Sequence, residues 1–331
     1  MAEVLTTGDG RKLTYEQRGV PDGTPVFFFH GTPGSRIGPL PRSGLLYRLG
    51  IRLITYDRPG YGESEANPGR TVASCAADVA SIAEELDLKR FAVVGRSGGG
   101  PHALACAALL PDNVTRVAAF VSLAPFEAEG LDWFAGMSES NVLEYKTARS
   151  GRDPLSSRLT VAAEKIRNNP VHLIASLYSE LPKADRRVIR DVGIRRMLEE
   201  NYAEAMQQLA AGWIDDALAF CNPWGFDVRD IEIPTLLWHG TDDIFSPLSH
   251  SLWLADHIPT ASMTLKSGAA HFDALDALPN FLPWLICEDQ GPGVWGPSPR
   301  VRFKRPAGEQ AVAHDEVIGM TLTEYGPTRL K

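Results

Sequence analysis

Two short β-prone pieces open the chain, and continuous apolar runs of strand length follow them as far as residue 125. VLTTGDG and KLTYEQRG are joined by an Asp-Gly turn, which predicts a β-hairpin. PVFFFHGTPGS (25–35) and RLITYDRPGYGES (52–64) each predict a buried strand that runs into a Gly/Pro-rich loop. KRFAVVG (89–95) and RVAAFVSLAP (116–125) predict two further strands.

Helical periodicity separates these strands. In ASCAADVASIAEELDL (73–88), apolar side chains recur on one helical face at Val79, Ile82, Ala83 and Leu86. PHALACAALLP follows the strand KRFAVVG and predicts a second helix. Strands that alternate with helices indicate an α/β fold with a mostly parallel sheet and helices on both of its faces.

Residues 126–229 break this alternation. The segment is charged and aromatic and has no clear buried strand, and LDWFAGMSESNVLEYK, LTVAAEKIRNN and RRMLEENYAEAMQQLAAGW are its expected helices. The α/β pattern resumes at IPTLLWHGTDD (233–243) and ASMTLKSGAAH (261–271). We therefore predict one α/β core built from residues 1–125 and 230–288, with an α-helical cap inserted at 126–229.

The last segment, residues 289–331, has a different composition. In GPGVWGPSPRVRFKRPAG, glycine, proline, arginine and lysine predominate, which predicts an extended or disordered tail. A basic anchor for an acidic partner is the alternative interpretation.

Composition narrows the class of protein and its partners. The 331 residues are 44% hydrophobic and 22% charged, enough for one large core. A net charge of −8 without a long basic block in the main body argues against nucleic acid as a partner.

No apolar run approaches the roughly 20 residues that span a bilayer, and the first residues lack the pattern of a signal peptide. Four widely spaced cysteines predict reduced thiols, so we expect a cytoplasmic protein without a membrane partner.

The densest glycine cluster surrounds Ser97. Gly95-Arg96-Ser97-Gly98-Gly99 satisfies G-x-S-x-G between a predicted strand and a predicted helix, the context of a nucleophile elbow. A dinucleotide-binding loop would need glycine where Ser97 stands, and a P-loop would need a lysine directly after its last glycine. A mere strand-to-helix turn is the remaining structural alternative.

A serine nucleophile needs a base and an orienting carboxylate, which follow it in the order acid, then histidine. Asp242 and Asp243 come just after a predicted strand, and His271 follows the next one. A zinc site built from His30, His239, Asp242 and His271 is a competing interpretation, but these residues lack a recognised ligand spacing.

Four segments together resemble the α/β-hydrolase superfamily, in particular its capped bacterial serine hydrolases of the esterase and proline-iminopeptidase-like branch. They are HGTPGS, DRPGYGES, GRSGGGPHALACAALLP, and HGTDDIFSP followed by GAAH. The family pattern HG-x-x-D-x-x-x-P implies Asp243 as the acid, with Asp242 and Glu127 as fallbacks. The resemblance covers residues 25–125 and 230–286.

An oxyanion hole needs two backbone donors. The amide after the nucleophile, that of Gly98, is expected to be one of them. The resemblance implies Thr32 as the other, since Pro33 has no N–H. DRPGYGES is expected to form a tight structural turn, and a substrate contact by Arg58 is the alternative.

The constellation predicts acyl transfer to water, with Ser97 attacking a carbonyl, His271 as the base and Asp243 holding the histidine. We expect a small or medium-sized, largely apolar ester, lactone or amide as the small-molecule substrate, and no metal or organic cofactor. The expected apolar pocket includes Trp133, Phe134 and Trp213, although each of these could instead pack the cap on the core.

Two other functions stay open. A proline iminopeptidase would bind a substrate amine through an acid such as Glu139, Glu144 or Glu204. However, this chain has HGTPG and GRSGG where those enzymes typically have HGGPG and GGSWG. A non-hydrolytic member of the fold, such as a cyclase, a carbon–carbon bond hydrolase or a ligand-binding protein, would carry the same three residues. The sequence also leaves a homodimer open.

Overall fold

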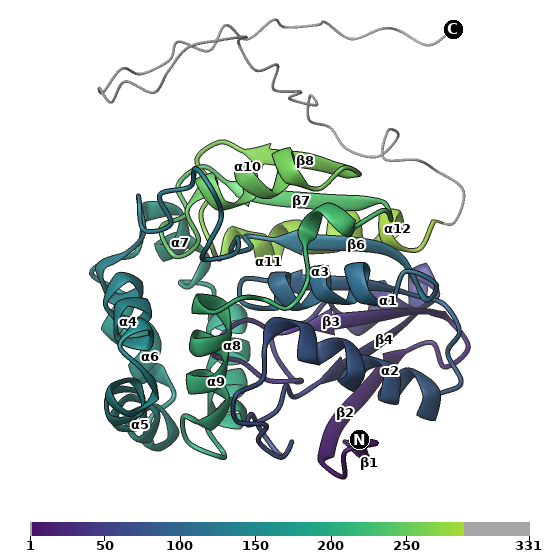
Figure 1. Ribbon diagram of the computed structural model, residues 1–331, viewed down its shortest axis with the longest axis horizontal. Helices are drawn as coiled ribbons and strands as arrows, with labels where there is room; N and C mark the ends of the chain where they lie inside the picture. The colour runs from purple at the N-terminus through teal and green to yellow at the C-terminus, as the bar shows by residue number, and fades with distance from the viewer. Residues whose placement is uncertain (1, 288–331) are drawn as a thin grey trace, which may run out of the picture. The chain divides into compact units, whose positions relative to one another are not determined.

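A computed structural model describes residues 2–287 (Figure 1). The tail predicted at 289–331 lies outside the described residues. In the described part of the chain, the strands form one sheet in the order β1-β2-β4-β3-β5-β6-β7-β8. The strands are β1 (Glu3–Thr6), β2 (Lys12–Gly19), β3 (Thr24–Phe29), β4 (Ile51–Tyr56), β5 (Phe91–Arg96), β6 (Val114–Phe120), β7 (Thr235–Gly240) and β8 (Ala261–Lys266).

Pairing in this sheet is antiparallel for β1 with β2 and for β2 with β4, and parallel for every later neighbour. The predicted mostly parallel sheet is thereby confirmed. All six residues of β5, FAVVGR, are buried, as expected for a central strand that is covered on both faces.

Helices cover both faces of the sheet, also as predicted. One face packs against α2 (Cys75–Glu85), α3 (Gly99–Leu109) and α10 (Leu248–His257). The other packs against α1 (Ser43–Leu49), α11 (Asp273–Ala277) and α12 (Leu282–Leu285). The predicted apolar stripe of α2 is buried at Val79, Ile82 and Ala83. Burial of a side chain as large as that of Val79 or Ile82 contributes roughly 1.5–3 kcal/mol.

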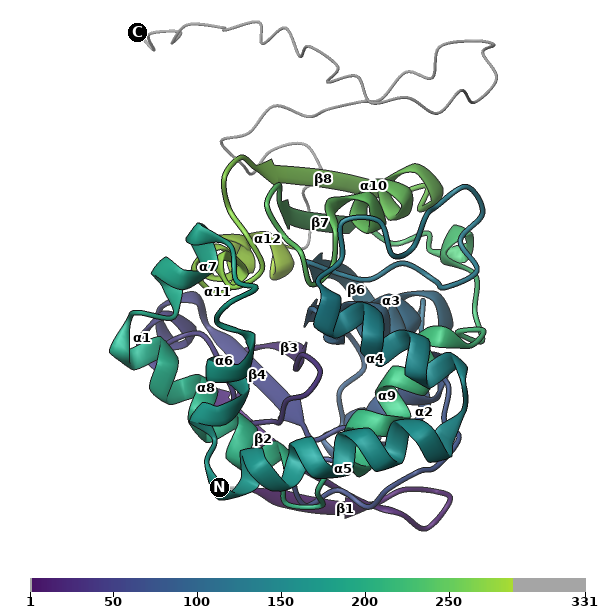
Figure 2. The same cartoon turned by 90° about the vertical axis from the view of Figure 1, so that its left-hand side faces the viewer.

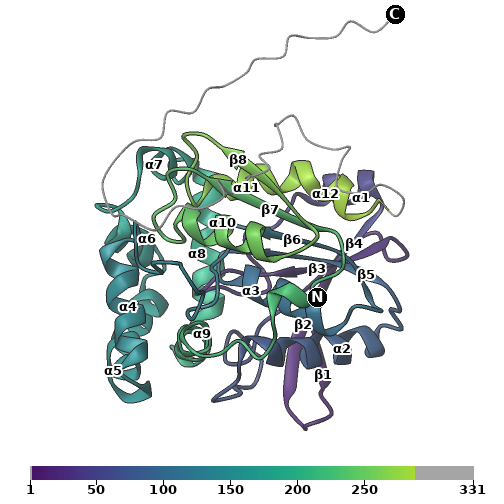
Figure 3. The same ribbon diagram turned by 45° about the horizontal axis from the view of Figure 1, so that its top comes forward.

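The insertion between β6 and β7 is helical in the structure. It contains α4 (Glu139–Arg149), α5 (Arg152–Asn168), α6 (Val171–Leu177), α7 (Lys183–Val188), α8 (Val192–Ala205) and α9 (Ala211–Cys221). Figure 2 shows these helices arranged around the carboxyl ends of the parallel strands, and Figure 3 shows them gathered at one side of the sheet. We call α4–α9 the cap helices.

Two of the predicted cap helices have other bounds. Residues 131–138 of LDWFAGMSESNVLEYK lie outside any helix, with a turn at 133–136. Helix α4 begins only after Ser138, whose hydroxyl accepts a hydrogen bond from the amide of Asn141. RRMLEENYAEAMQQLAAGW is not one helix, because it divides into α8 and α9 where Leu209 adopts a φ of 54°. Within residues 2–287, no helix combines the length and apolarity needed to cross a membrane.

Helix α3 approaches the sheet so closely that its first residue must be glycine. A Cβ on Gly99 would lie 2.7 Å from the carbonyl carbon of Phe29, and this backbone cannot move aside without distorting β3. Gly99→Ala is therefore expected to lower the free energy of unfolding by roughly 1–3 kcal/mol. The urea midpoint at unchanged m-value measures this loss.

Gly44→Ala, at an exposed position of α1, is the matched control, because a Cβ there meets nothing within 4 Å. This variant should keep or raise the stability, by up to about 1 kcal/mol. Equal urea midpoints for the two variants would contradict the close approach of α3 to β3.

Candidate active site

Ser97 occupies a sharp turn between β5 and α3. Its φ of 56° lies in the left-handed region, which few residues other than glycine adopt without strain. The turn is held by two bonds: the Ser97 amide donates to the Phe120 carbonyl (2.9 Å), and the Ser97 carbonyl accepts from the Gly100 amide (2.8 Å). A Cβ on Gly95 would lie 2.8 Å from Gly100 N. The end of β5 and the start of α3 can therefore approach this closely only because residue 95 is glycine.

Asp243 and His271 form a buried hydrogen-bonded pair. His271 Nδ1 lies 2.8 Å from Asp243 Oδ2, although Asp243 follows β7 and His271 lies beyond β8. Asp243 Oδ1 accepts from the amides of Phe245 (2.8 Å) and Ser246 (3.1 Å). Burial alone would raise the pKa of Asp243, but His271 and these bonds outweigh burial and hold the pKa below its usual value. The carboxylate is therefore an ionised anchor for the imidazole.

The two fallback acids lie elsewhere. Asp242 is exposed and accepts from the Thr241 hydroxyl (2.9 Å). Glu127 is also exposed and lines a different cleft, beside Trp224. Within residues 2–287, Asp243 is the carboxylate that bonds to His271.

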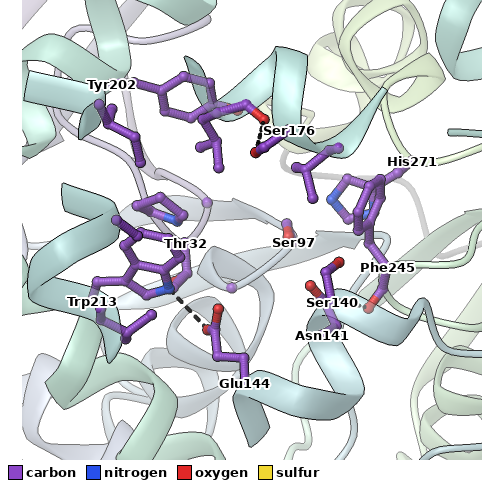
Figure 4. A pocket seen from close by; sticks show the side chains of 18 of the residues that line it. Thr32, Ser97, Ser140, Asn141, Glu144, Ser176, Tyr202, Trp213, Phe245 and His271 are labelled. Carbon is purple, nitrogen blue, oxygen red and sulfur yellow. Dashed lines mark hydrogen bonds between the residues drawn. The ribbon is translucent and has the colours of Figure 1, made fainter. Parts of the chain in front are cut away.

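Ser97 and His271 face a common cavity of about 360 Å³ between the sheet and the cap helices. Figure 4 shows Ser97 in the middle of this cavity, with His271 and Phe245 on one side of it. The cap contributes much of the wall through α4, α5 and α6. Apolar lining residues include Pro33, Leu159, Ala162, Ile166, Leu173 and Leu177.

The amides of Thr32 and Gly98 are both available at the cavity. Both residues line it, and no acceptor within residues 2–287 takes a hydrogen bond from either amide. The two loops touch, since a Cβ on Gly98 would lie 2.7 Å from Thr32 Cβ. Two free N–H groups thus lie beside the Ser97 turn.

Arg58 determines which way the Thr32 amide points. Its buried guanidinium donates to the carbonyls of His30 (2.5 Å) and Gly31 (3.0 Å). In a trans peptide, the carbonyl of one residue and the N–H of the next point in opposite directions. Because Arg58 holds the Gly31 carbonyl, the Thr32 N–H is turned away from Arg58. Arg58 does not line the cavity, so its role in the turn DRPGYGES is structural.

Asp216 of α9 completes this buried network. It accepts from Arg58 Nη2 (2.6 Å), Arg70 Nη2 (2.6 Å), the Tyr61 hydroxyl (2.9 Å) and the Thr32 hydroxyl (2.6 Å). Burial raises the pKa of Asp216, but the two guanidinium groups more than offset this and keep the pKa well below its usual value. Removing one partner of such a buried pair typically costs about 3–5 kcal/mol.

Of the three aromatic residues predicted to contact substrate, the structure brings only Trp213 to the cavity. The expectation for Trp133 and Phe134 is wrong for this cavity. Trp133 Nε1 donates to the Ala124 carbonyl (2.9 Å), and the ring packs on His250 with centroids 5.0 Å apart. Phe134 packs on Trp133, with centroids 5.3 Å apart. Both residues therefore join the insertion to the core.

Glu144 of α4 lies in the cavity wall, whereas the other two candidate acids for an amine do not. Trp213 Nε1 donates to Glu144 Oε1 (2.8 Å), as drawn in Figure 4. Glu204 is instead paired with Arg36, and Glu139 is exposed at the start of α4. Burial raises the pKa of Glu144 to about 7, against the opposing effects of the Trp213 bond and of Arg158.

The residues of the competing zinc site have other bonds. Both ring nitrogens of His239 are occupied, Nδ1 by the Ser251 hydroxyl and Nε2 by the Ser246 carbonyl, each at 2.7 Å. His30 Nδ1 lies 2.8 Å from the Gly31 carbonyl. Among the described residues, no group of three or more His, Cys, Asp or Glu side chains could hold a metal ion.

Comparison with known proteins agrees with this fold. The family model described as the alpha/beta hydrolase fold matches residues 24–278, so the chain belongs to that family. The chain is 26% identical over 269 residues to a non-heme chloroperoxidase of Streptomyces lividans, covering 80% of this chain and 90% of that protein. It is 25% identical over 315 residues to a proline iminopeptidase of Neisseria meningitidis, covering 85% and 96% of the two chains.

Solved structures show the same likeness. An enol-lactonase from Burkholderia xenovorans superposes with a TM-score of 0.62 at 19% identity, over 84% of this chain and 96% of that one. A thermophilic esterase from Thermogutta terrifontis gives a TM-score of 0.59 at 21% identity, over 87% and 100%. At these identities the structural likeness concerns the fold alone.

Titration of Glu144 should change how the free energy of unfolding depends on pH. Its pKa is raised from 4.5 to about 7, so the folded protein keeps a proton that the unfolded chain has already released. Stability therefore falls as the pH rises through this interval. Glu144→Gln removes the titration and is expected to flatten this fall, measured by urea unfolding between pH 4.5 and about pH 7.

Glu139→Gln is the matched control, because Glu139 lies on the same helix but is exposed and outside the cavity. That variant should keep the wild-type pH profile. If Glu144→Gln also kept it, the raised pKa of Glu144 would be refuted.

Proposed function

We propose that the protein is a serine hydrolase that cleaves a small or medium-sized, largely apolar carboxylic ester, lactone or amide. The hydrogen bond between Asp243 and His271, at a cavity shared with Ser97 in its left-handed turn, is the observation that carries this proposal. The relative named as a proline iminopeptidase supports hydrolysis as the reaction class.

The reaction begins when His271 Nε2 takes the proton of Ser97 Oγ as the serine attacks the substrate carbonyl. Asp243 fixes the proton of His271 on Nδ1 and stabilises the imidazolium that forms. The amides of Thr32 and Gly98 bind the oxyanion, and loss of one such donor typically lowers kcat by about 10²–10³-fold. His271 then protonates the leaving group.

The second half of the reaction regenerates the enzyme. Water, activated by His271, attacks the acyl group on Ser97 and releases the acid. The helix N-terminus of α3 lies directly after Ser97, where its partial positive charge favours the negative charge of both tetrahedral intermediates.

The cavity supports a substrate of modest size. A volume of about 360 Å³ lies near the lower end of the range of about 300–1,000 Å³ for small-molecule sites. Apolar side chains from α5 and α6 make up much of its wall, which favours a largely apolar substrate.

An aminopeptidase is the second candidate, and Glu144 is the observation that favours it. Glu144 is an acid on the cavity wall, and its ionised form could pair with the ammonium group of an aminoacyl substrate. Because burial raises its pKa to about 7, this pairing would strengthen above neutral pH.

A fluorophosphonate probe tests the proposal without knowledge of the substrate. The probe is expected to label Ser97, because it reacts with serines that a base has activated. Peptide mass spectrometry locates the modified residue. Ser97→Ala and His271→Ala should both lose the label while keeping the wild-type melting temperature within a few degrees. If the Ser97→Ala protein were still labelled, the proposal would be contradicted.

The two adjacent aspartates give a sharp test of the acid. Asp243→Asn should lower the rate of ester hydrolysis by about 10⁴-fold, because an amide in place of the carboxylate holds the wrong histidine tautomer. Asp242→Asn should change the rate less than threefold, since this exposed side chain does not contact His271. If Asp242→Asn lowered kcat more than Asp243→Asn did, the catalytic acid would be Asp242 and not Asp243.

A further inference from the structure

Arg96, the residue before Ser97, is a buried cation without a partner. Only 6% of the residue is exposed, and its Nε is buried without a hydrogen-bond acceptor. Among the residues that the structure describes, no acidic group lies within ion-pair distance of this guanidinium. Other buried arginines are paired: Arg36 with Asp57, and Arg58 and Arg70 each with Asp216 at 2.6 Å.

The guanidinium lies beside the loop that carries the Thr32 amide. A Cβ built on Gly31 would lie 3.4 Å from Arg96 Nη2, and both Gly31 and Arg96 line the cavity. Tyr202, another lining residue, is close enough for the charge of Arg96 to act on it. Arg96 thus lines the cavity next to the serine itself, and it also borders a second cleft between α1 and α8.

Neither of the two nearby acids forms an ion pair with Arg96. Asp243 bonds to His271 and to two backbone amides. Asp185 of α7 accepts from the Phe272 amide at 2.7 Å, and its second oxygen has no partner within residues 2–287. Both carboxylates exert a charge effect on Arg96, but neither forms an ion pair with it.

An uncompensated buried charge destabilises the folded protein, so the protein is stabilised when a ligand supplies the counter-ion. The N-terminus of α3 adds partial positive charge at the same place. We propose that Arg96 binds a carboxylate of the substrate, and that the substrate is an otherwise apolar ester or lactone with an acid group a few bonds from the scissile carbonyl. This inference rests on the proposed function for the position of that carbonyl.

The charge of Glu144 favours one orientation of the substrate in the cavity. Figure 4 shows Tyr202 and Glu144 on different sides of Ser97. A substrate carboxylate is attracted on the Arg96 and Tyr202 side and repelled on the Glu144 side whenever Glu144 is ionised. The acid group therefore lies away from Glu144, and the apolar remainder packs on side chains such as Leu159, Ile166 and Leu173. Arg158 and Lys165 of α5 also line the cavity, but both are exposed to solvent, unlike Arg96.

Two matched esters test the inference: mono-4-nitrophenyl glutarate and 4-nitrophenyl pentanoate, which differ at the far end of a five-carbon acyl chain. The wild type is expected to hydrolyse the acidic ester with a kcat/KM higher by about 10–100-fold, the usual effect of a hydrogen-bonded charge. Arg96→Met should abolish this preference, mainly through KM, and Arg96→Lys should restore part of it. Arg90→Met removes an exposed positive charge at the other end of β5 and should keep the preference.

Binding separates this inference from the proposed function. Glutarate should raise the melting temperature of the Ser97→Ala protein, and Arg96→Met in that background should abolish the shift. Arg96→Met alone should leave the melting temperature unchanged or higher, because a buried unpaired charge is removed. A lower melting temperature would instead identify Arg96 as an internal counter-ion of Asp185 and overturn the inference.

Two further results have distinct meanings. Normal hydrolysis of both esters without a preference for the acidic one would overturn the inference and leave the proposed function standing. If neither ester is hydrolysed, the glutarate shift decides: its loss in Arg96→Met supports the carboxylate site even though the hydrolytic proposal fails.

Discussion

The buried carboxylate of Asp216 connects helix α9 of the cap to the core. Its oxygens accept from Arg58, Arg70, Tyr61 and Thr32, so α9, the turn after β4 and the loop after β3 meet at one charge. Since Arg58 also holds the carbonyl of Gly31, the direction of the Thr32 amide depends on an acid contributed by the cap. The same interaction therefore contributes both to the attachment of the cap and to the geometry of the site, and both are weakened if this charge is neutralised.

The core and the centre of the site could be predicted from local sequence patterns. Apolar runs such as FAVVGR predict strands buried on both faces, and the glycines around Ser97 indicate a turn that no larger residue could make. The choice between Asp242 and Asp243 needed the family pattern, because two adjacent acids look alike in a sequence. The structure distinguishes them through the backbone: the turn after β7 directs the amides of Phe245 and Ser246 toward Asp243.

Features that depend on distant partners could not be predicted in this way. Asp216 lies 158 positions after Arg58, and no local pattern links the two. Trp133 and Phe134 resemble pocket residues by type, but their position just after β6 places them against His250 and Phe126. The missing partner of Arg96 is likewise invisible in GRSGG. Its only signal in the sequence is a charged residue at a position that the strand pattern makes buried.

The attachment of α9 has a consequence for how molecules reach the serine. Because Asp216 is bound on several sides, α9 cannot swing away without separating buried charges, and the cap does not open as one rigid flap. The opposite wall is built differently: Val161 of α5 and His172 and Ser176 of α6 line the cavity and are also exposed to solvent. We therefore expect substrate to enter and product to leave between α5 and α6. Small displacements of these two helices would widen the opening of the cavity there without moving the residues around Ser97.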